Sequence, residues 1–285
     1  ETYGSGAEAA YSTRRLNGNV TDCMVIRRAS DSTTTTIGFD GSGNISEADI
    51  ISFCTGTSCT VYQWLDQSGN GNTATAPSTG AEPTIYTGGA IVKENGKPCL
   101  QYDTTGTDTF DMATALTSVQ SVFEVLNSTQ TLSQAFLLGD ATVNNYVADV
   151  DKDLLRSSAL AAILNGTTRV NGVSQNFTTT IRPLNQSVIS MIHTSASANV
   201  SQLTEDRSNG RSWDGNMQEI ILYENDKSAY LTDIEENIGD YFTQNTPLLD
   251  TYTGAAAAYS LRKLRTAYTG DAVEVYNGSS YADIG

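Results

Sequence analysis

The sequence predicts an all-β fold of the sandwich or barrel class, with one short helix near the end of a large unit. Charged residues make up only 17 % of the chain. Ser, Thr, Asn and Gly supply most of its polar character, which favours short strands and turns over helices. Runs rich in β-branched and aromatic residues also recur at intervals of about ten residues, and Gly, Asn and Ser separate them.

The predicted strands follow one another along most of the chain. They cover residues 23–28, 33–39, 60–67, 84–92, 98–103, 121–127, 134–140, 145–150, 160–166, 169–173, 188–195 and 216–225. Two stretches depart from this pattern. Residues 9–16 (AAYSTRRL) alternate poorly and suggest a short helix. Residues 230–242 have helical spacing, with Thr232 as the expected N-cap. The apolar face of this predicted helix consists of Leu231, Ile234, Ile238, Tyr241 and Phe242.

A long-range repeat defines the domain organisation. The phrase at 2–16, TYGSGAEAAYSTRRL, returns at 251–264 as TYTGAAAAYSLRKL. A period of roughly 250 residues corresponds to a whole domain rather than to a solenoid repeat. We therefore expect a module at 1–246, a linker at 247–254, and the truncated start of a second copy at 255–285. Tandem arrays of this kind are typical of structural or adhesive proteins, and neighbouring copies of the module are expected partners.

The net charge of −16 excludes several partners. A polyanion has no electrostatic reason to approach nucleic acid or an anionic membrane surface. No apolar run reaches the length of a membrane span, so we expect no membrane insertion.

Four cysteines suggest disulfides. Cys54 and Cys59 flank a tight turn in FCTGTSC, which predicts a short-loop disulfide. Cys23 and Cys99 lie in strand-like runs and could form a second bridge, although the other pairings remain formally open. Disulfides indicate an oxidising, extracellular setting. A Cys₄ zinc site would need two close cysteine pairs, and only one exists.

The phrase WLDQSGNGNTAT is the first candidate glycan site. Trp64 offers an aromatic face, while Asp66, Gln67, Asn70 and Asn72 supply planar polar groups on a Gly-rich loop. Carbohydrate sites combine these features. The alternative is that the polar side chains only satisfy backbone groups of a long turn.

A second candidate glycan site precedes the predicted strand at 216–225. It consists of Asp206, Arg207, Asn209, Arg211 and Trp213. The alternative is that Trp213 belongs to the core and that the arginines pair with nearby acids.

Three aspartates could carry hydrolytic chemistry or bind a metal. Asp149, Asp151 and Asp153 alternate, so they share one face if this segment is a strand. Paired carboxylates can act as nucleophile and general acid in glycoside hydrolysis, or hold Ca²⁺. The alternative is a solvated strand face. We assign no metal or cofactor, with Ca²⁺ left open. His193 lacks a Ser–His–Asp context and is expected to be structural.

Several phrases resemble a known family. AAYSTRRL, SDSTTTTI, FCTGTSC, DQSGNGN, NGKPCLQYD and DGNMQEIILYEND are similar to laminin-G/concanavalin-A-like jelly-roll domains of phage and bacterial surface proteins. They also resemble the catalytic domain of B-type α-L-arabinofuranosidases. The resemblance implies a two-sheet jelly roll over most of residues 7–242, in an extracellular, cell-surface or virion setting.

The resemblance places catalytic roles on two positions. The family's nucleophilic glutamate lies in a D-x-E-N-N phrase, which Asp151 matches with a side chain one methylene shorter. Asp206, in EDRSNG, matches the family's acid/base aspartate. The family's vicinal cysteine pair has no counterpart in QAFLLGDA.

Of these three family features, the sequence retains the acid/base aspartate alone. The interpretation therefore favours a structural or adhesive glycan-binding protein without enzymatic activity. Its expected partner is a polysaccharide or cell-surface glycan. A glycosidase using Asp151 and Asp206, and a purely architectural fibre subunit, are the alternatives.

Overall fold

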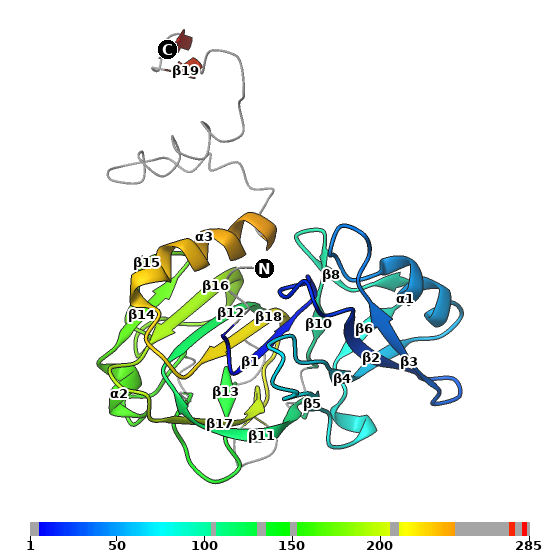
Figure 1. Cartoon of the computed structure of the whole chain (residues 1–285), viewed down its shortest axis with the longest axis horizontal. Coiled ribbons are helices and arrows are strands. Elements are labelled where there is room, and N and C mark those ends of the chain that lie inside the picture. The colour runs from blue at the N-terminus through cyan, green and yellow to red at the C-terminus, as the bar shows by residue number, and fades with distance from the viewer. Residues whose placement is uncertain are drawn as a thin grey trace. The chain divides into compact units, whose positions relative to one another are not determined.

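The computed structural model describes residues 6–103, 107–129, 135–148, 153–205 and 211–242, together with two strands in the C-terminal unit. The chain divides into two compact units, Glu1–Gln244 and Asn245–Gly285. The first unit is an all-β sandwich with a short C-terminal helix, as the sequence predicts (Figure 1).

The strands of the first unit form one continuous, curled antiparallel sheet. Its main order is β13-β17-β11-β5-β4-β6-β10-β18-β12-β16-β14-β15, with β1, β2, β3 and β7 attached to it. The strands of the N-terminal half are β1 (Ala9–Ser12), β2 (Asp22–Arg28), β3 (Thr34–Gly38), β4 (Cys59–Trp64), β5 (Ala74–Thr75), β6 (Thr84–Thr87), β7 (Ala90–Ile91) and β10 (Leu100–Gln101). A separate small ribbon pairs β8 (Lys93–Glu94) with β9 (Lys97–Pro98). The later strands are β11 (Phe110–Val119), β12 (Ser121–Ser128), β13 (Leu138–Gly139), β14 (Thr167–Val170), β15 (Val173–Ser174), β16 (Leu184–Ile192), β17 (Ala198–Leu203) and β18 (Asn216–Tyr223).

The centre of this sheet is buried on both faces. In β12, Val122 and Leu126 point into the main core between the layers, while Phe123 and Val125 point into a second core. Helix α3 (Leu231–Phe242) covers that second core with Leu231, Ile234, Ile238 and Phe242. Because both faces are covered, β12 and β18 lack the alternation of a half-exposed strand.

The N-terminal phrase AAYS forms a strand, so the predicted helix at 9–16 is wrong. Ala9–Ser12 are all buried, and they pair in antiparallel register with Glu219–Leu222 of β18. Tertiary pairing therefore overrides the helical preference of the alanines.

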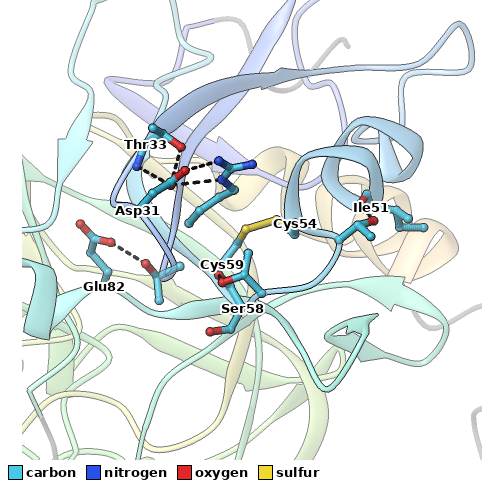
Figure 2. The surroundings of a disulfide bond; sticks show 11 residues. Asp31, Thr33, Ile51, Cys54, Ser58, Cys59 and Glu82 are labelled. Carbon is cyan, nitrogen blue, oxygen red and sulfur yellow. Dashed lines mark hydrogen bonds and ion pairs between the residues drawn. A yellow bond between two sulfur atoms is a disulfide. The ribbon is translucent and has the colours of Figure 1, made fainter.

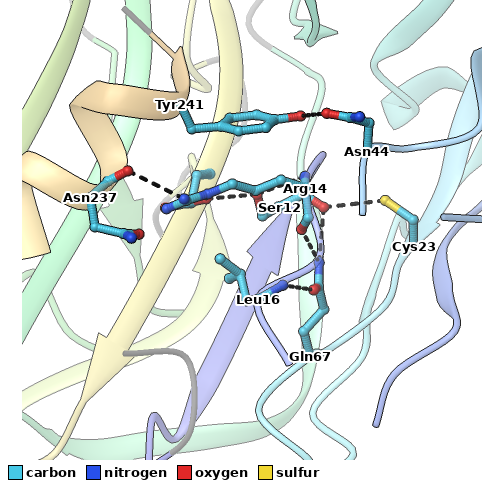
Figure 3. Close-up of polar contacts among 9 residues, drawn as sticks. Ser12, Arg14, Leu16, Cys23, Asn44, Gln67, Asn237 and Tyr241 are labelled. Carbon is cyan, nitrogen blue, oxygen red and sulfur yellow. Dashed lines mark hydrogen bonds and ion pairs between the residues drawn. The ribbon is translucent and has the colours of Figure 1, made fainter. Parts of the chain in front are cut away.

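Figure 3 shows how this N-terminal segment joins the sheet to α3. The Arg14 guanidinium donates to Glu219 at 2.7 Å and to the carbonyl of Asn237 in the helix at 3.3 Å. The Tyr241 hydroxyl donates to Asn44 at 2.6 Å.

The helices differ from the prediction in three respects. Helix α1 (Glu47–Cys54) has no counterpart among the predicted elements; Ser46 caps it, and its hydroxyl accepts from the Asp49 N–H. Helix α3 begins at Leu231, after a 3₁₀ turn at Ser228–Tyr230, so Thr232 lies inside the helix and is not the N-cap. A short helix α2 spans Ala161–Leu164, within one of the predicted strands. No helix among the described residues is long and apolar enough to cross a membrane.

In the C-terminal unit the structure describes one hairpin, β19 (Glu274–Tyr276) with β20 (Tyr281–Asp283). At the 248-residue offset that relates Tyr11 to Tyr259, these strands correspond to residues 26–28 and 33–35 of the first unit. The pairs Glu274↔Asp283 and Val275↔Ala282 then have the same register as Ile26↔Thr35 and Arg27↔Thr34 of the β2–β3 hairpin. The linker at 247–254 lies outside the described residues, and the tandem-module boundaries stay a prediction.

Candidate functional site

Two short segments contain the carboxylates that the resemblance places in catalytic roles. Asp151 falls within 149–152, and Asp206 falls within 206–210 together with Arg207 and Asn209; all of them lie outside the described residues. The site is therefore built from the described residues that border these segments.

One buried ion pair joins the borders of the two segments. Asp153, at the C-terminal border of the first segment, forms a backbone bridge with Ile181. The next residue, Arg182, donates to Asp214 at 3.0 Å, and both side chains are fully buried. Asp214 in turn accepts from Ser128 at 3.0 Å and comes shortly after the second segment. The backbone that follows each candidate carboxylate is thus held, directly or through Ile181, by the same Arg182–Asp214 ion pair.

The backbone leading into residue 206 is held in a rare conformation. Thr204 has a φ of +72°, which is unusual for a β-branched residue. Its hydroxyl donates to the Asp108 carbonyl at 3.2 Å, and the Thr109 hydroxyl donates to the Leu203 carbonyl at 2.9 Å. These bonds fix the end of β17 against the start of β11. Strained residues of this kind cluster at functional sites.

The Asp108 carboxyl beside this turn is buried, and its pKa is raised. Burial raises the pKa of its carboxyl to about 6, although the Asp103 N–H, which donates to it at 2.7 Å, opposes the shift.

A buried carboxyl that sequence reasoning missed lies in the main core. Glu124 has no exposed surface, and neither of its carboxyl oxygens has a hydrogen-bond partner among the described residues. The buried Tyr146 hydroxyl likewise has no partner within this part of the chain. Burial raises the pKa of Glu124 well above its usual value. The sequence signal was that Glu124 shares one face of the predicted strand with Val122 and Leu126, whose side chains point inward.

The His193 side chain is buried beside Tyr146. Its ring packs 5.8 Å from the Tyr146 ring, centroid to centroid, and its Nδ1 lies 3.0 Å from the Val119 carbonyl. Burial lowers the pKa of His193 to about 4, so the ring is neutral near pH 7.

Trp64, Gln67 and Asn72 of the first predicted glycan loop are buried, whereas Asn70 is exposed. Trp64 has no exposed surface and packs between Tyr11 and Phe110, with ring centroids 5.8 and 6.3 Å away. The Asp66 carboxylate accepts the N–H groups of Ala10 and Asn72, each at 2.9 Å. These contacts organise the turn and leave no aromatic face for a sugar.

The amides of the same loop also hold backbone groups. Gln67 is fully buried; it accepts from the Leu16 N–H at 2.7 Å and donates to the Ser12 carbonyl at 2.9 Å (Figure 3). Asn72 forms two bonds with the Thr114 backbone, and Asn70 donates to the Ala7 carbonyl. The structure gives this loop the turn-building role that was the alternative.

The described part of the second predicted glycan site is also inward-facing. Trp213 is fully buried, and its Nε1 donates to the Asn127 carbonyl at 2.6 Å. The Arg211 carbonyl accepts from the Phe136 N–H at 3.0 Å. Trp213 therefore belongs to the core, and its position beside a charged loop in the sequence does not indicate a sugar site.

The cysteines of the described residues form one disulfide. Cys54, at the end of α1, is bonded to Cys59, at the start of β4, as predicted (Figure 2). The second bridge is wrong: Cys23 and Cys99 are both free and buried. The Cys23 thiol instead donates to the Ser12 carbonyl at 3.2 Å. No group of three or more His, Cys, Asp or Glu within the described ranges is arranged to hold a metal ion.

A polar groove of about 450 Å³ lies on the outer face of β2, β4, β5 and β11. Its lining includes Arg27, Tyr62, Thr75, Ser78, Glu82 and Asp111. No local motif indicates this groove, because its residues come from four separate parts of the chain.

The comparisons with known proteins relate the chain to carbohydrate-active enzymes. Residues 2–116 match the family model described as alpha-L-arabinofuranosidase B, catalytic. A GH54 α-L-arabinofuranosidase soaked with a cyclic sulfate inhibitor is similar in structure, with a TM-score of 0.56 and 16 % identity. A point mutant of a GH54 α-L-arabinofuranosidase soaked with 4-nitrophenyl α-L-arabinofuranoside gives 0.53 and 17 %. In both cases the similarity covers 81 % of this chain and 62 % of the other. Comparison with curated protein sequences gives no match.

These findings correct the functional prediction. The matched family model is a catalytic domain, so the main interpretation as a structural or adhesive module without enzymatic activity is wrong. The missing nucleophilic glutamate and the missing vicinal cysteines favoured a protein without activity. The N-terminal phrases, which lie in the matched residues 2–116, were the stronger signal. The relation to the arabinofuranosidase catalytic domain, and the all-β sandwich that it implies, are confirmed.

Proposed function

We propose that the chain is a glycoside hydrolase of the α-L-arabinofuranosidase type, which removes arabinofuranosyl groups from a polysaccharide. The match of residues 2–116 to the catalytic family model carries this proposal. The chain spans about 62 % of the length of the similar solved structures, so the proposal concerns the catalytic module. The Cys54–Cys59 disulfide supports an extracellular location, where polysaccharides are found.

Asp151 and Asp206 are the proposed catalytic pair. Asp206 donates its proton to the glycosidic oxygen as the bond from that oxygen to the anomeric carbon breaks. Asp151 attacks the anomeric carbon and forms a glycosyl ester. Asp206 then takes a proton from water, the water attacks the anomeric carbon, and arabinose leaves with the Asp151 carboxylate restored. The Arg182–Asp214 pair and the Thr204–Asp108 bond support this assignment, because they anchor the backbone beside both residues.

Hydrolysis of two arabinofuranosides that differ in leaving group tests the roles separately. Asp206→Asn should lower kcat/KM on an arabinan by about 10²–10⁴-fold, the usual contribution of acid catalysis. The loss should be much smaller on 4-nitrophenyl α-L-arabinofuranoside, because nitrophenolate leaves without protonation. Asp151→Asn should abolish turnover of both. Asp233→Asn, at an exposed position of α3, is the matched control and should retain activity.

The length of the nucleophile gives a second test. The family phrase has Glu where this chain has Asp151, so the attacking oxygen is one methylene further from the sugar. Asp151→Glu should therefore raise kcat, by about tenfold if the misplacement costs roughly 1.4 kcal/mol of the barrier. An absence of arabinose release by the wild type from every arabinofuranoside tested, with the Cys54–Cys59 bond intact, would contradict the proposed function.

A further inference from the structure

We propose that the outer groove lined by Arg27, Tyr62, Thr75, Ser78, Glu82 and Asp111 is a binding subsite for the main chain of a neutral polysaccharide. This inference rests on the proposed function, because it assigns the groove to the polymer whose arabinofuranosyl groups are removed. None of the residues that the sequence suggested for glycan binding lines this groove.

A fixed cation and an aromatic ring form one wall of the groove. The Arg27 guanidinium donates to Glu82 at 2.8 Å and lies 4.6 Å from the centroid of the Tyr62 ring. Glu82, whose side chain is only 1 % exposed, also accepts from the Thr60 hydroxyl at 2.5 Å (Figure 2). Because Glu82 is held from two sides, Arg27 and Tyr62 are positioned before any ligand binds. Preorganised side chains of this kind reduce the entropic cost of binding.

Unused hydrogen-bonding groups occupy the open part of the groove. The hydroxyls of Tyr62 and Ser78 make no hydrogen bond to another described residue. On the opposite side, Asp111 is exposed and accepts from Gln202 through one carboxylate oxygen at 2.9 Å, which leaves its other oxygen available. Hydroxyl, guanidinium and carboxylate groups beside an apolar ring match the alternating hydroxyls and C–H faces of a sugar.

The charge of the protein selects a neutral polymer over an acidic one. Two anionic side chains and one cation line the groove, and Glu82 already neutralises Arg27. The whole chain carries a net charge of −16. A polyuronate would be repelled at moderate ionic strength, whereas a polymer of neutral pentoses or hexoses meets no such repulsion.

One lining residue of the groove, Asp111, contacts Gln202 of β17, the strand that precedes Asp206 in the sequence. Gln202 lies near the end of β17, four residues before Asp206 in the sequence. Phe110, next to Asp111, pairs with Leu203 in the same ladder. A main chain bound along the groove would therefore extend past the strand that leads into the proposed acid/base residue.

Native gel electrophoresis through immobilised polysaccharide tests the subsite without requiring catalysis. Debranched arabinan and arabinoxylan should retard the wild type, and polygalacturonate should not. Tyr62→Ala should raise the dissociation constant for the neutral polymer by about tenfold, equivalent to roughly 1.4 kcal/mol. Ser78→Arg, an exposed position that fills the groove without touching the core, should have a similar effect. The matched controls are Tyr230→Ala and Ser42→Arg, which are also exposed and should bind as the wild type does.

The outcomes separate the subsite from the proposed function. If both groove variants are retarded like the wild type, or if no neutral polymer retards the protein, the subsite is refuted whatever the activity. If binding weakens as expected but no arabinofuranoside is cleaved, the groove stands and the proposed function fails. In an active enzyme, the loss of kcat/KM in the groove variants should be about tenfold greater on the polymer than on 4-nitrophenyl α-L-arabinofuranoside, matching the tenfold loss of affinity.

Discussion

The Glu124 carboxyl is buried without a hydrogen-bond partner among the described residues, and such a position costs the fold stability. A carboxyl group that is buried without a hydrogen bond stays in its neutral, protonated form, because the interior cannot solvate the charged form. Its pKa in the folded protein lies well above that of an exposed glutamate. The native state therefore binds more protons than the unfolded state above about pH 4, and stability should fall as the pH rises from there.

Glu124→Gln tests this directly. At pH 7 the variant should be more stable than the wild type, by at least about 1 kcal/mol, because no ionisation is suppressed on folding. At about pH 3.5 the two proteins should have nearly equal free energies of unfolding, since Glu124 is then protonated in both states. Urea unfolding at several pH values measures the difference. Asp233→Asn, at an exposed position, should show no such pH-dependent gain; an equal gain in that control would refute the interpretation.

The candidate site also shows, residue by residue, the limits of sequence reasoning. For Trp213 a core position was the stated alternative, and for the Trp64 loop it was a turn-building role, but the sequence could not decide between these roles and a sugar site. Aromatic rings beside amides look the same in both cases, and only burial distinguishes them. Conversely, Tyr62, Glu82 and Asp111 come together through strand pairing, and no local motif encodes that proximity.

At the scale of elements, strands with β-branched and aromatic residues could be predicted, but elements decided by tertiary context could not. Ala9–Ser12 is alanine-rich and becomes a strand because β18 pairs with it along its whole length. Helix α3 was predictable, because its apolar residues recur every three or four positions over the second core. Helix α1 has a weaker pattern; its capping serine was the signal that was overlooked.

The disulfide is the link between α1 and the sheet, and its contribution can be measured. It closes a short loop, with a sequence separation of 5 between Cys54 and Cys59. Chain-entropy arguments assign such a loop a stabilisation of about 2 kcal/mol. The double variant Cys54→Ala/Cys59→Ala should lose about that much in urea unfolding. Reductant should destabilise the wild type but leave the double variant unchanged.

Thiol counting provides the control for this assignment. After unfolding without reductant, the wild type should expose two alkylatable thiols, those of Cys23 and Cys99. Burial raises the pKa of both thiols, so neither should react readily in the folded protein. Four protected cysteines after unfolding would show that a second bridge forms after all.

At the scale of the whole molecule, the first unit has the features of an independently folding module. Its sheet is completed by β1 on β18, its second core is covered by α3, and that helix ends at Phe242. The described strands of the C-terminal unit, β19 and β20, pair with each other. The described residues that build both cores lie between Ala7 and Phe242. We therefore expect the first unit to keep its stability without residues 245–285.

Truncation after Gln244 is the test at this scale. The shortened chain should keep its free energy of unfolding within about 0.5 kcal/mol of the full chain, because both hydrophobic cores are built from residues of the first unit. It should also keep its affinity for neutral polysaccharide and any arabinofuranosidase activity. A large loss of stability would mean that residues 245–285 complete the first unit. In that case the shared register of β19–β20 and β2–β3 would not reflect a second module, and the repeat would instead be a structural part of a single larger domain.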